Sequence, residues 1–160
     1  MDILKRIEQD HKTARKLMEQ LKKEDDPHGR SALFDKLQRE LWSHAKVEET
    51  VLYAAMIQAA GEKHETLEGF SEHHTINGLL DEVTDMPTEG PAWGAKFDVL
   101  AELVEHHLDE EEEELFAEAR EALGEERLKE LGGAFDERKR HALSALEPLP
   151  ERAKKKKGAA

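Results

Sequence analysis

An internal repeat constrains the fold of this 160-residue chain more than any other feature of its sequence. Residues 34–54 match residues 97–117 at one constant offset, and apolar residues recur in both copies at steps of three and four, which is typical of amphipathic helices. On the same apolar stripe, each copy carries a histidine four residues before a glutamate. The matched pairs are Phe34/Phe97, Asp35/Asp98, Leu37/Leu100, Leu41/Val104, His44/His107, Glu48/Glu111, Glu49/Glu112, Leu52/Leu115, Tyr53/Phe116 and Ala54/Ala117. An imidazole and a carboxylate on the inward face of a helix need a partner, and we expect a metal ion.

A shorter repeat precedes each of these segments, because residues 10–21 match residues 72–83. The matched pairs are Asp10/Glu72, His11/His73, Ala14/Ile76, Leu17/Leu79, Met18/Leu80, Gln20/Glu82 and Leu21/Val83. The chain therefore reads as two related helical hairpins in tandem. In each hairpin the first helix carries a histidine on its apolar stripe, and the second carries the His-x3-Glu pair.

The hairpins predict an all-α fold, an up-down-up-down four-helix bundle with a short C-terminal helical extension. We expect the four helices over residues 2–23, 31–60, 62–85 and 92–123, with Ser31 capping the second and glycine or proline in the connections. Residues 1–123 form the bundle and 124–150 the extension, in which Gly132 and Gly133 separate a short helical turn from a terminal helix. Residues 151–160 are predicted to be a disordered, Lys-rich tail.

Composition excludes several classes of protein. The formal net charge of −13 argues against a nucleic-acid partner, because such proteins neutralise phosphates with basic patches. The chain has no cysteine, which excludes disulfides, thiol catalysis and thiolate metal sites. We find no signal peptide and no apolar run long enough to span a bilayer, so we expect no membrane partner and a cytoplasmic location.

The four repeated histidines are expected to meet at one level of the bundle. His11 and His44 lie at similar distances from the first connection, about 18–20 Å at about 1.5 Å of rise per residue. His73 and His107 lie at a similar depth from the second connection. Six buried ligand-type groups without partners would cost about 1–3 kcal/mol each, comparable in sum with a domain stability of about 5–15 kcal/mol. Histidine–glutamate pairing without a metal remains an alternative, but it does not explain the duplicated spacing.

Four imidazoles and two carboxylates exceed the needs of one tetrahedral zinc ion. They suit two metal ions, with a histidine pair at each ion and carboxylates that can bridge them. His74 and His106 adjoin proposed ligands but lie where the stripes turn polar, so we interpret both as boundary residues. His28, His64 and His141 are expected to be solvated, and Trp42 and Trp93 to be packing residues. In the acidic run 109–114, only Glu111, with Glu112 as an alternative, is expected to point inward.

The spacing of these motifs resembles the hemerythrin-like, HHE cation-binding domain. The motifs are Asp10-His11, His44-x3-Glu48-Glu49, Glu72-His73-His74 and His106-His107-x3-Glu111. The resemblance covers residues 1–123 and implies a non-haem di-iron centre with two iron ions. It implies that His11, His44, His73 and His107 are terminal ligands and that Glu48 and Glu111 are bridges.

The chain departs from the oxygen-carrying members of that family at two places. The carriers have a fifth histidine four residues before the ligand of the third helix, where this chain has Gly69. The position that this histidine would occupy could be filled by a water molecule, Tyr53, a glutamate or an exogenous ligand. The carriers also place the last carboxylate five residues after its histidine, which fits Glu112 better than Glu111.

The resemblance implies a protein that binds or senses a small ligand, namely dioxygen, nitric oxide or peroxide. A redox enzyme that consumes peroxide and an iron-handling protein are alternatives. A ferritin-like centre would instead show a repeated Glu-x-x-His motif. That motif occurs only once near the repeats, at Glu8 and His11, so this alternative is weak.

Overall fold

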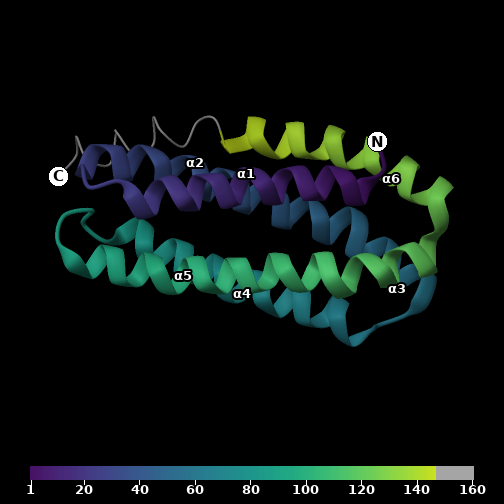
Figure 1. Cartoon of the computed structure of the whole chain (residues 1–160). Coiled ribbons are helices and arrows are strands. Elements are labelled where there is room, and N and C mark those ends of the chain that lie inside the picture. The colour runs from purple at the N-terminus through teal and green to yellow at the C-terminus, as the bar shows by residue number, and fades with distance from the viewer. Residues whose placement is uncertain (147–160) are drawn as a thin grey trace.

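The computed structural model describes residues 1–146, which form a bundle of antiparallel helices with no strand (Figure 1). We call each of the four long helical segments of the bundle a rod. The first rod is α1 (Ile3–Lys23) and the third is α4 (His64–Asp85). The second combines α2 (Pro27–Glu48), η1 (Glu49–Tyr53) and α3 (Ala54–Ala60). The fourth combines α5 (Pro91–Glu110), η2 (Glu111–Leu115) and the start of α6 (Phe116–Leu146). The predicted all-α bundle is confirmed, while the predicted Lys-rich tail lies outside the described residues.

The second rod begins earlier than predicted. Asp26 is its cap, and the Asp26 carboxylate accepts a hydrogen bond from the Gly29 amide at 2.9 Å. Pro27 occupies the first helical position, where its missing N–H costs nothing. Ser31 therefore lies inside α2, and the prediction that it caps the helix is wrong.

The C-terminal part of α6 folds back along α1, and it also contacts α2 (Figure 1). The reversal occurs at Gly124, whose φ of 73° is readily adopted only by glycine. The helix then continues through Gly132 and Gly133, so the predicted break at that pair is wrong. A Cβ on Gly132 would lie 2.2 Å from the carbonyl oxygen of Met1. This glycine therefore allows the N-terminal backbone to approach the helix closely.

The core consists of two apolar clusters. One cluster is built around Ile7, Leu52 and Phe135, and the other around Met18 and Phe97. Along α1 the first cluster ends at Ile7 and the second begins at Ala14, so the polar layer that contains His11 lies between them. No described helix is long and apolar enough to cross a membrane.

The second and fourth rods each contain a single π-helical turn, and the two turns differ by one residue in their position in the repeat. One starts at Glu49, directly after Glu48, and the other starts at Glu111. Such turns shift the helical phase and occur frequently at functional sites. Val51, Leu52 and Tyr53, which lie in the first of these turns, are all buried.

Candidate metal centre

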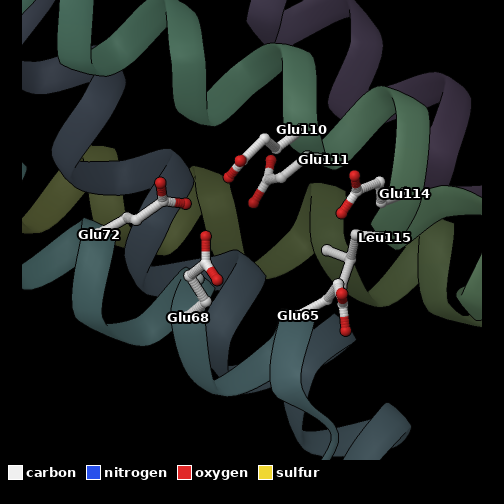
Figure 2. A pocket seen from close by; sticks show the side chains of 8 residues that line it. Glu65, Glu68, Glu72, Glu110, Glu111, Glu114 and Leu115 are labelled. Atoms are coloured by element: carbon white, nitrogen blue, oxygen red, sulfur yellow. The ribbon is translucent and has the colours of Figure 1, made fainter.

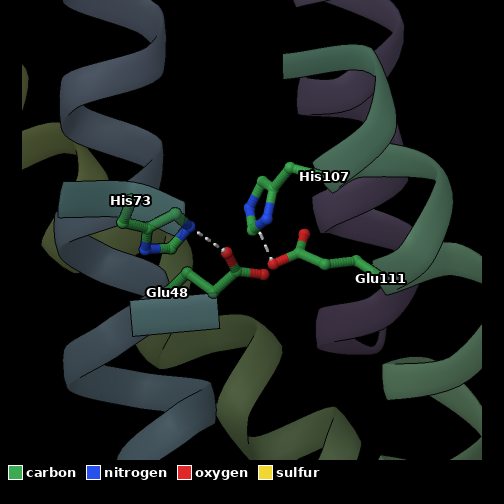
Figure 3. A group of neighbouring side chains, drawn as sticks. All are labelled: Glu48, His73, His107 and Glu111. Carbon is green, nitrogen blue, oxygen red and sulfur yellow. Dashed lines mark ion pairs between the residues drawn. The ribbon is translucent and has the colours of Figure 1, made fainter. Parts of the chain in front are cut away.

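The six predicted ligands meet in the layer between the two apolar clusters. Each of the four rods contributes a histidine, and the second and fourth rods each add a glutamate. All six residues are between 0% and 4% exposed: His11, His44, Glu48, His73, His107 and Glu111. Figure 3 shows four of them, with the two carboxylates directed toward each other and each close to an imidazole.

The six residues fall into two groups, within each of which the potential ligand atoms lie within 4.8 Å of one another. One group contains His11, His44 and Glu111, and the other contains His73, His107 and both glutamates. Each group thus takes the histidine pair of one hairpin. The rings of a pair meet edge to face, with centroids 5.2 Å apart in the first group and 4.7 Å apart in the second.

Each glutamate lies between the two groups. Glu48 Oε2 is 3.5 Å from His44 Nε2 and 3.3 Å from His73 Nε2. Glu111 Oε2 is 3.2 Å from His11 Nε2, and its Oε1 is 3.1 Å from His107 Nε2. Each carboxylate is therefore shared between the two histidine pairs.

The inward-facing atoms of the centre lack hydrogen-bond partners. They include Nε2 of all four histidines, both carboxylate oxygens of Glu48 and Oε2 of Glu111. Buried polar atoms are nearly always paired, and each unpaired atom costs about 1–3 kcal/mol. Because imidazole nitrogens and carboxylate oxygens are the donors that first-row metal ions accept, this donor set fits a pair of cations.

The outward-facing nitrogen of every histidine contacts a carboxylate. Nδ1 of His44 lies 2.9 Å from Asp10, and Nδ1 of His107 lies 2.8 Å from Glu72. Such outer carboxylates fix the tautomer and the orientation of a ligating imidazole, so that Nε2 faces the metal. Asp10 and Glu72 are a matched pair of the repeat, as are the histidines that they contact.

The other two histidines receive the equivalent support from the second rod and the fourth. Nδ1 of His11 lies 2.7 Å from Glu112, and Nδ1 of His73 lies 3.3 Å from Glu49. The structure therefore places Glu112 outside both groups, as a contact of a histidine and of Arg15. Sequence reasoning considered Glu112 as an alternative ligand and assigned no role to Asp10, Glu49 or Glu72. The signal was present, because acidic residues precede or follow proposed ligands at matched positions.

The two halves of the centre differ in their outer charges. Asp10 receives Lys139 Nζ at 2.7 Å and Arg6 Nη1 at 2.5 Å, and Glu112 receives Arg15 at 2.8 Å. Lys139 comes from the C-terminal part of α6 and is 4% exposed. The outer carboxylates of the His11/His44 half are thus paired with basic side chains. Nothing in the repeat pointed to Lys139, because the extension has no counterpart in either hairpin.

In the centre, the charges of neighbouring side chains shift pKa values in the direction opposite to the shift that burial causes. Burial lowers the pKa of His44, but Glu48 and Asp10 outweigh it and raise that pKa to about 10. Burial raises the pKa of Glu111, but the nearby charge of His107 holds it well below its usual range. Without a metal, protons thus supply the positive charge that the carboxylates need. Divalent cations would take over that role as they displace the protons.

Tyr53 occupies the space above Gly69. Its buried ring stacks on His73, with centroids 5.4 Å apart, and its hydroxyl donates a hydrogen bond to Glu111. A Cβ on Gly69 would lie 2.4 Å from that hydroxyl oxygen. Of the groups considered for the vacancy at Gly69, the structure thus places Tyr53 there. Burial, followed by the charge of Glu111, raises the pKa of Tyr53 well above its usual value, so the phenol remains a donor.

The remaining histidines lie apart from the centre. His28, His64, His74, His106 and His141 are all exposed. His74 and His106 point away from the groups that contain their neighbours, as the polar turn of their stripes predicted. Trp93 is buried in the second apolar cluster, and Trp42 is partly buried.

Comparison with known proteins relates the chain to a family. A protein from Nostoc sp. named "DNA nickase" is 29% identical over 135 residues, which cover 84% of this chain and 38% of that protein. The fold also matches the crystal structure of a hemerythrin HHE cation binding domain-containing protein from Mycobacterium kansasii, with a TM-score of 0.82 and 23% identity over 94% of this chain and 93% of that one. The family model "Hemerythrin HHE cation binding domain" matches residues 2–119. The chain therefore belongs to the hemerythrin HHE cation-binding domain family.

Proposed function

We propose that this protein holds two iron ions in the buried centre and binds a small ligand there, namely dioxygen, nitric oxide or peroxide. The convergence of four unpartnered imidazole nitrogens on two shared carboxylates carries the proposal. His11 and His44 would hold one ion and His73 and His107 the other, with Glu48 and Glu111 as bridges.

The donor set supports iron as the resident metal. Two imidazoles and a carboxylate with open positions form the ligand set of many non-haem Fe(II) sites, and each half offers this set. Zinc and copper compete well for such ligands, so supply in the cell also decides which metal is loaded. Iron ions in these positions would supply redox activity and vacant coordination positions for the small ligand.

The protein's own residues would orient and limit that chemistry. Asp10, Glu49, Glu72 and Glu112 hold the four imidazoles with Nε2 inward, and the two apolar clusters keep bulk water from the layer. Tyr53 holds a proton at its hydroxyl, next to Glu111. We therefore propose a module that binds or senses a small ligand as the principal function.

A redox enzyme that consumes peroxide is the second candidate, and one observation favours it. Tyr53 stands over Gly69, where the oxygen carriers that the chain resembles have a fifth imidazole. A centre with fewer nitrogen ligands is less suited to reversible oxygen binding. We expect at least slow consumption of peroxide by the iron-loaded protein.

Two measurements test these proposals. Anaerobic loading of the metal-free chain with Fe²⁺, followed by removal of the excess, should leave two iron ions per chain. One tightly bound tetrahedral zinc ion, with no second site, would contradict the di-iron proposal. Stopped-flow mixing of the loaded chain with dioxygen then separates the two functions. A long-lived adduct that releases oxygen under vacuum, without peroxide turnover, would indicate that the protein is a reversible oxygen carrier. Two stably held iron ions that react with none of the three ligands would indicate iron handling.

DNA nicking is not part of the proposal. The name of the Nostoc relative describes a protein of which this chain matches 38%. Because the chain has a net charge of −13, we expect that it does not retard duplex DNA in a gel-mobility assay at physiological salt.

A further inference from the structure

A strongly acidic pocket lies beside the His73/His107 half of the centre, between α4 and the fourth rod (Figure 2). Its lining consists of Glu65, Glu68, Gly69, Glu72, Glu110, Glu111, Glu114 and Leu115. The eight lining residues thus include six glutamates and no lysine or arginine. Like charges gathered around one opening repel each other, and the opening favours a cation.

One wall of this pocket belongs to the metal centre itself. Glu111 lines the pocket, is only 3% exposed, and has its Oε1 atom 3.1 Å from His107 Nε2. Figure 2 shows its carboxylate directed toward the space between Glu72 and Glu110. The pocket therefore leads from the surface to a proposed ligand that is otherwise shielded from solvent.

Two glutamates of the pocket lining, Glu72 and Glu110, belong to a second set of ligand-type atoms, which His106 completes next to the pocket. Glu72, His106 and Glu110 offer atoms that all lie within 4.8 Å of one another. His106 Nε2 is 3.0 Å from Glu110 Oε1, and the His106 side chain is 61% exposed. Glu72 links this set to the centre, because its Oε1 atom lies 2.8 Å from Nδ1 of His107.

The carboxylates beside the opposite half of the centre are paired with basic side chains. Arg6 and Lys139 pair with Asp10 next to His44, and Arg15 pairs with Glu112 next to His11. A cation that approached from that side would meet carboxylates that already have a positively charged partner. A cation that approached through the acidic pocket would meet carboxylates at every step.

We propose that Glu72, His106 and Glu110, with Glu68 beside them, form an outer binding site that captures a divalent cation and delivers it to the His73/His107 half of the centre. This inference rests on the proposed function, because it assumes that the buried centre takes up metal. Gly69 lines the pocket without a side chain, and the Tyr53 hydroxyl lies where a Cβ on Gly69 would be.

The rate of metal uptake tests the proposal. Metal-free full-length chain is mixed with Co²⁺ at low ionic strength, and the visible absorption of the bound ion is followed over time. The test variant is Glu68→Gln with Glu110→Gln, which removes two charges from the mouth and leaves the six buried ligands intact. The matched control is Asp98→Asn with Glu102→Gln, which removes two charges from exposed positions of α5 away from the pocket.

We expect the test variant to take up Co²⁺ about three- to tenfold more slowly than the unmodified chain, because a charged cleft raises the local concentration of its ligand. The difference should shrink in about 0.5 M salt, where exposed charges are screened. Both variants should bind the same final amount of Co²⁺ as the unmodified chain. The chain preloaded with two Co²⁺ ions should also bind one further, weakly held Mn²⁺ ion, detected by electron paramagnetic resonance, and the test variant should not.

The outcomes separate this inference from the proposed function. Equal uptake rates in the test variant and the unmodified chain, equal slowing in the control, or no difference in Mn²⁺ binding would overturn the outer site while the di-metal centre stands. An unmodified chain that binds no Co²⁺ in its buried centre would overturn both.

Discussion

The packing of Tyr53 over Gly69 yields the sharpest test of the structure, through the substitution Gly69→Ala. The new Cβ would lie 2.4 Å from the Tyr53 hydroxyl oxygen and 2.8 Å and 2.9 Å from two ring carbons. The ring is fully buried, lies against Phe70 and His73, and donates to Glu111, so it has little room to move. Overpacking of this kind costs about 1–3 kcal/mol.

Alanine also stabilises a helix by up to about 1 kcal/mol relative to glycine, and this gain must be separated from the clash. Gly78→Ala in the same helix provides the matched control, because a Cβ there meets nothing within 4 Å. We expect Gly69→Ala to unfold with a free energy about 2 kcal/mol lower than Gly78→Ala, or at a temperature about 4–8 °C lower. Urea and thermal unfolding of the metal-free chains measure both quantities. Equal stability of the two variants would refute the packing of Tyr53 against Gly69.

Three further predictions concern the centre. Glu111→Ala should reduce bound iron below two ions per chain in elemental analysis, whereas Glu113→Ala, on the exposed face, should retain both ions. The reverse result would show that Glu111 is not a metal ligand. Glu49→Gln should weaken metal affinity about 10–100-fold in a competition titration with a chelator, because it removes the outer carboxylate of His73; unchanged affinity would show that this contact does not orient the ring. Since the pKa of His44 is raised to about 10 in the folded chain, its stabilisation of the metal-free protein is fully present below pH about 6.5 and is lost as the pH rises through about 10. Urea unfolding should show this loss in the metal-free chain and not in the loaded chain, where metal replaces the protons; a rise in stability over the same window would contradict the coupling.

Much of the candidate site could be predicted from the sequence because the two copies of the repeat have equivalent residues at equivalent helical positions. His44 and His107, with a glutamate four residues later, identify the inward face of two helices without any knowledge of the partner helices. The lone histidines of the first and third rods follow from the same alignment. The outer carboxylates were visible in the same alignment, but nothing in a helical stripe shows which ring nitrogen a neighbouring acid will contact.

Errors of the sequence interpretation concentrate where local and tertiary preferences differ. A glycine pair in a sequence predicts a helix break, yet Gly132 and Gly133 continue α6 because the former allows the N-terminal backbone to pack against it. Ser31 is a reasonable cap by composition, but Asp26 with Pro27 provides a better one nearer the turn. The π-helical turns at Glu49 and Glu111 leave no signal in a regular period of 3.6 residues.

The sequence by itself determined the helical hairpins, their duplication and the level at which the imidazoles meet, because periodicity and spacing are local properties of the chain. Only the tertiary structure decided how these groups are shared. It placed Glu48 and Glu111 between the two histidine pairs, Tyr53 in the space above Gly69, and Lys139 of the extension on Asp10. It also paired the outer carboxylates of one half of the centre with basic side chains and placed the other half beside an acidic pocket. These features depend on which faces of distant segments pack together, since burial and charge at a site are sums over all the helices that surround it.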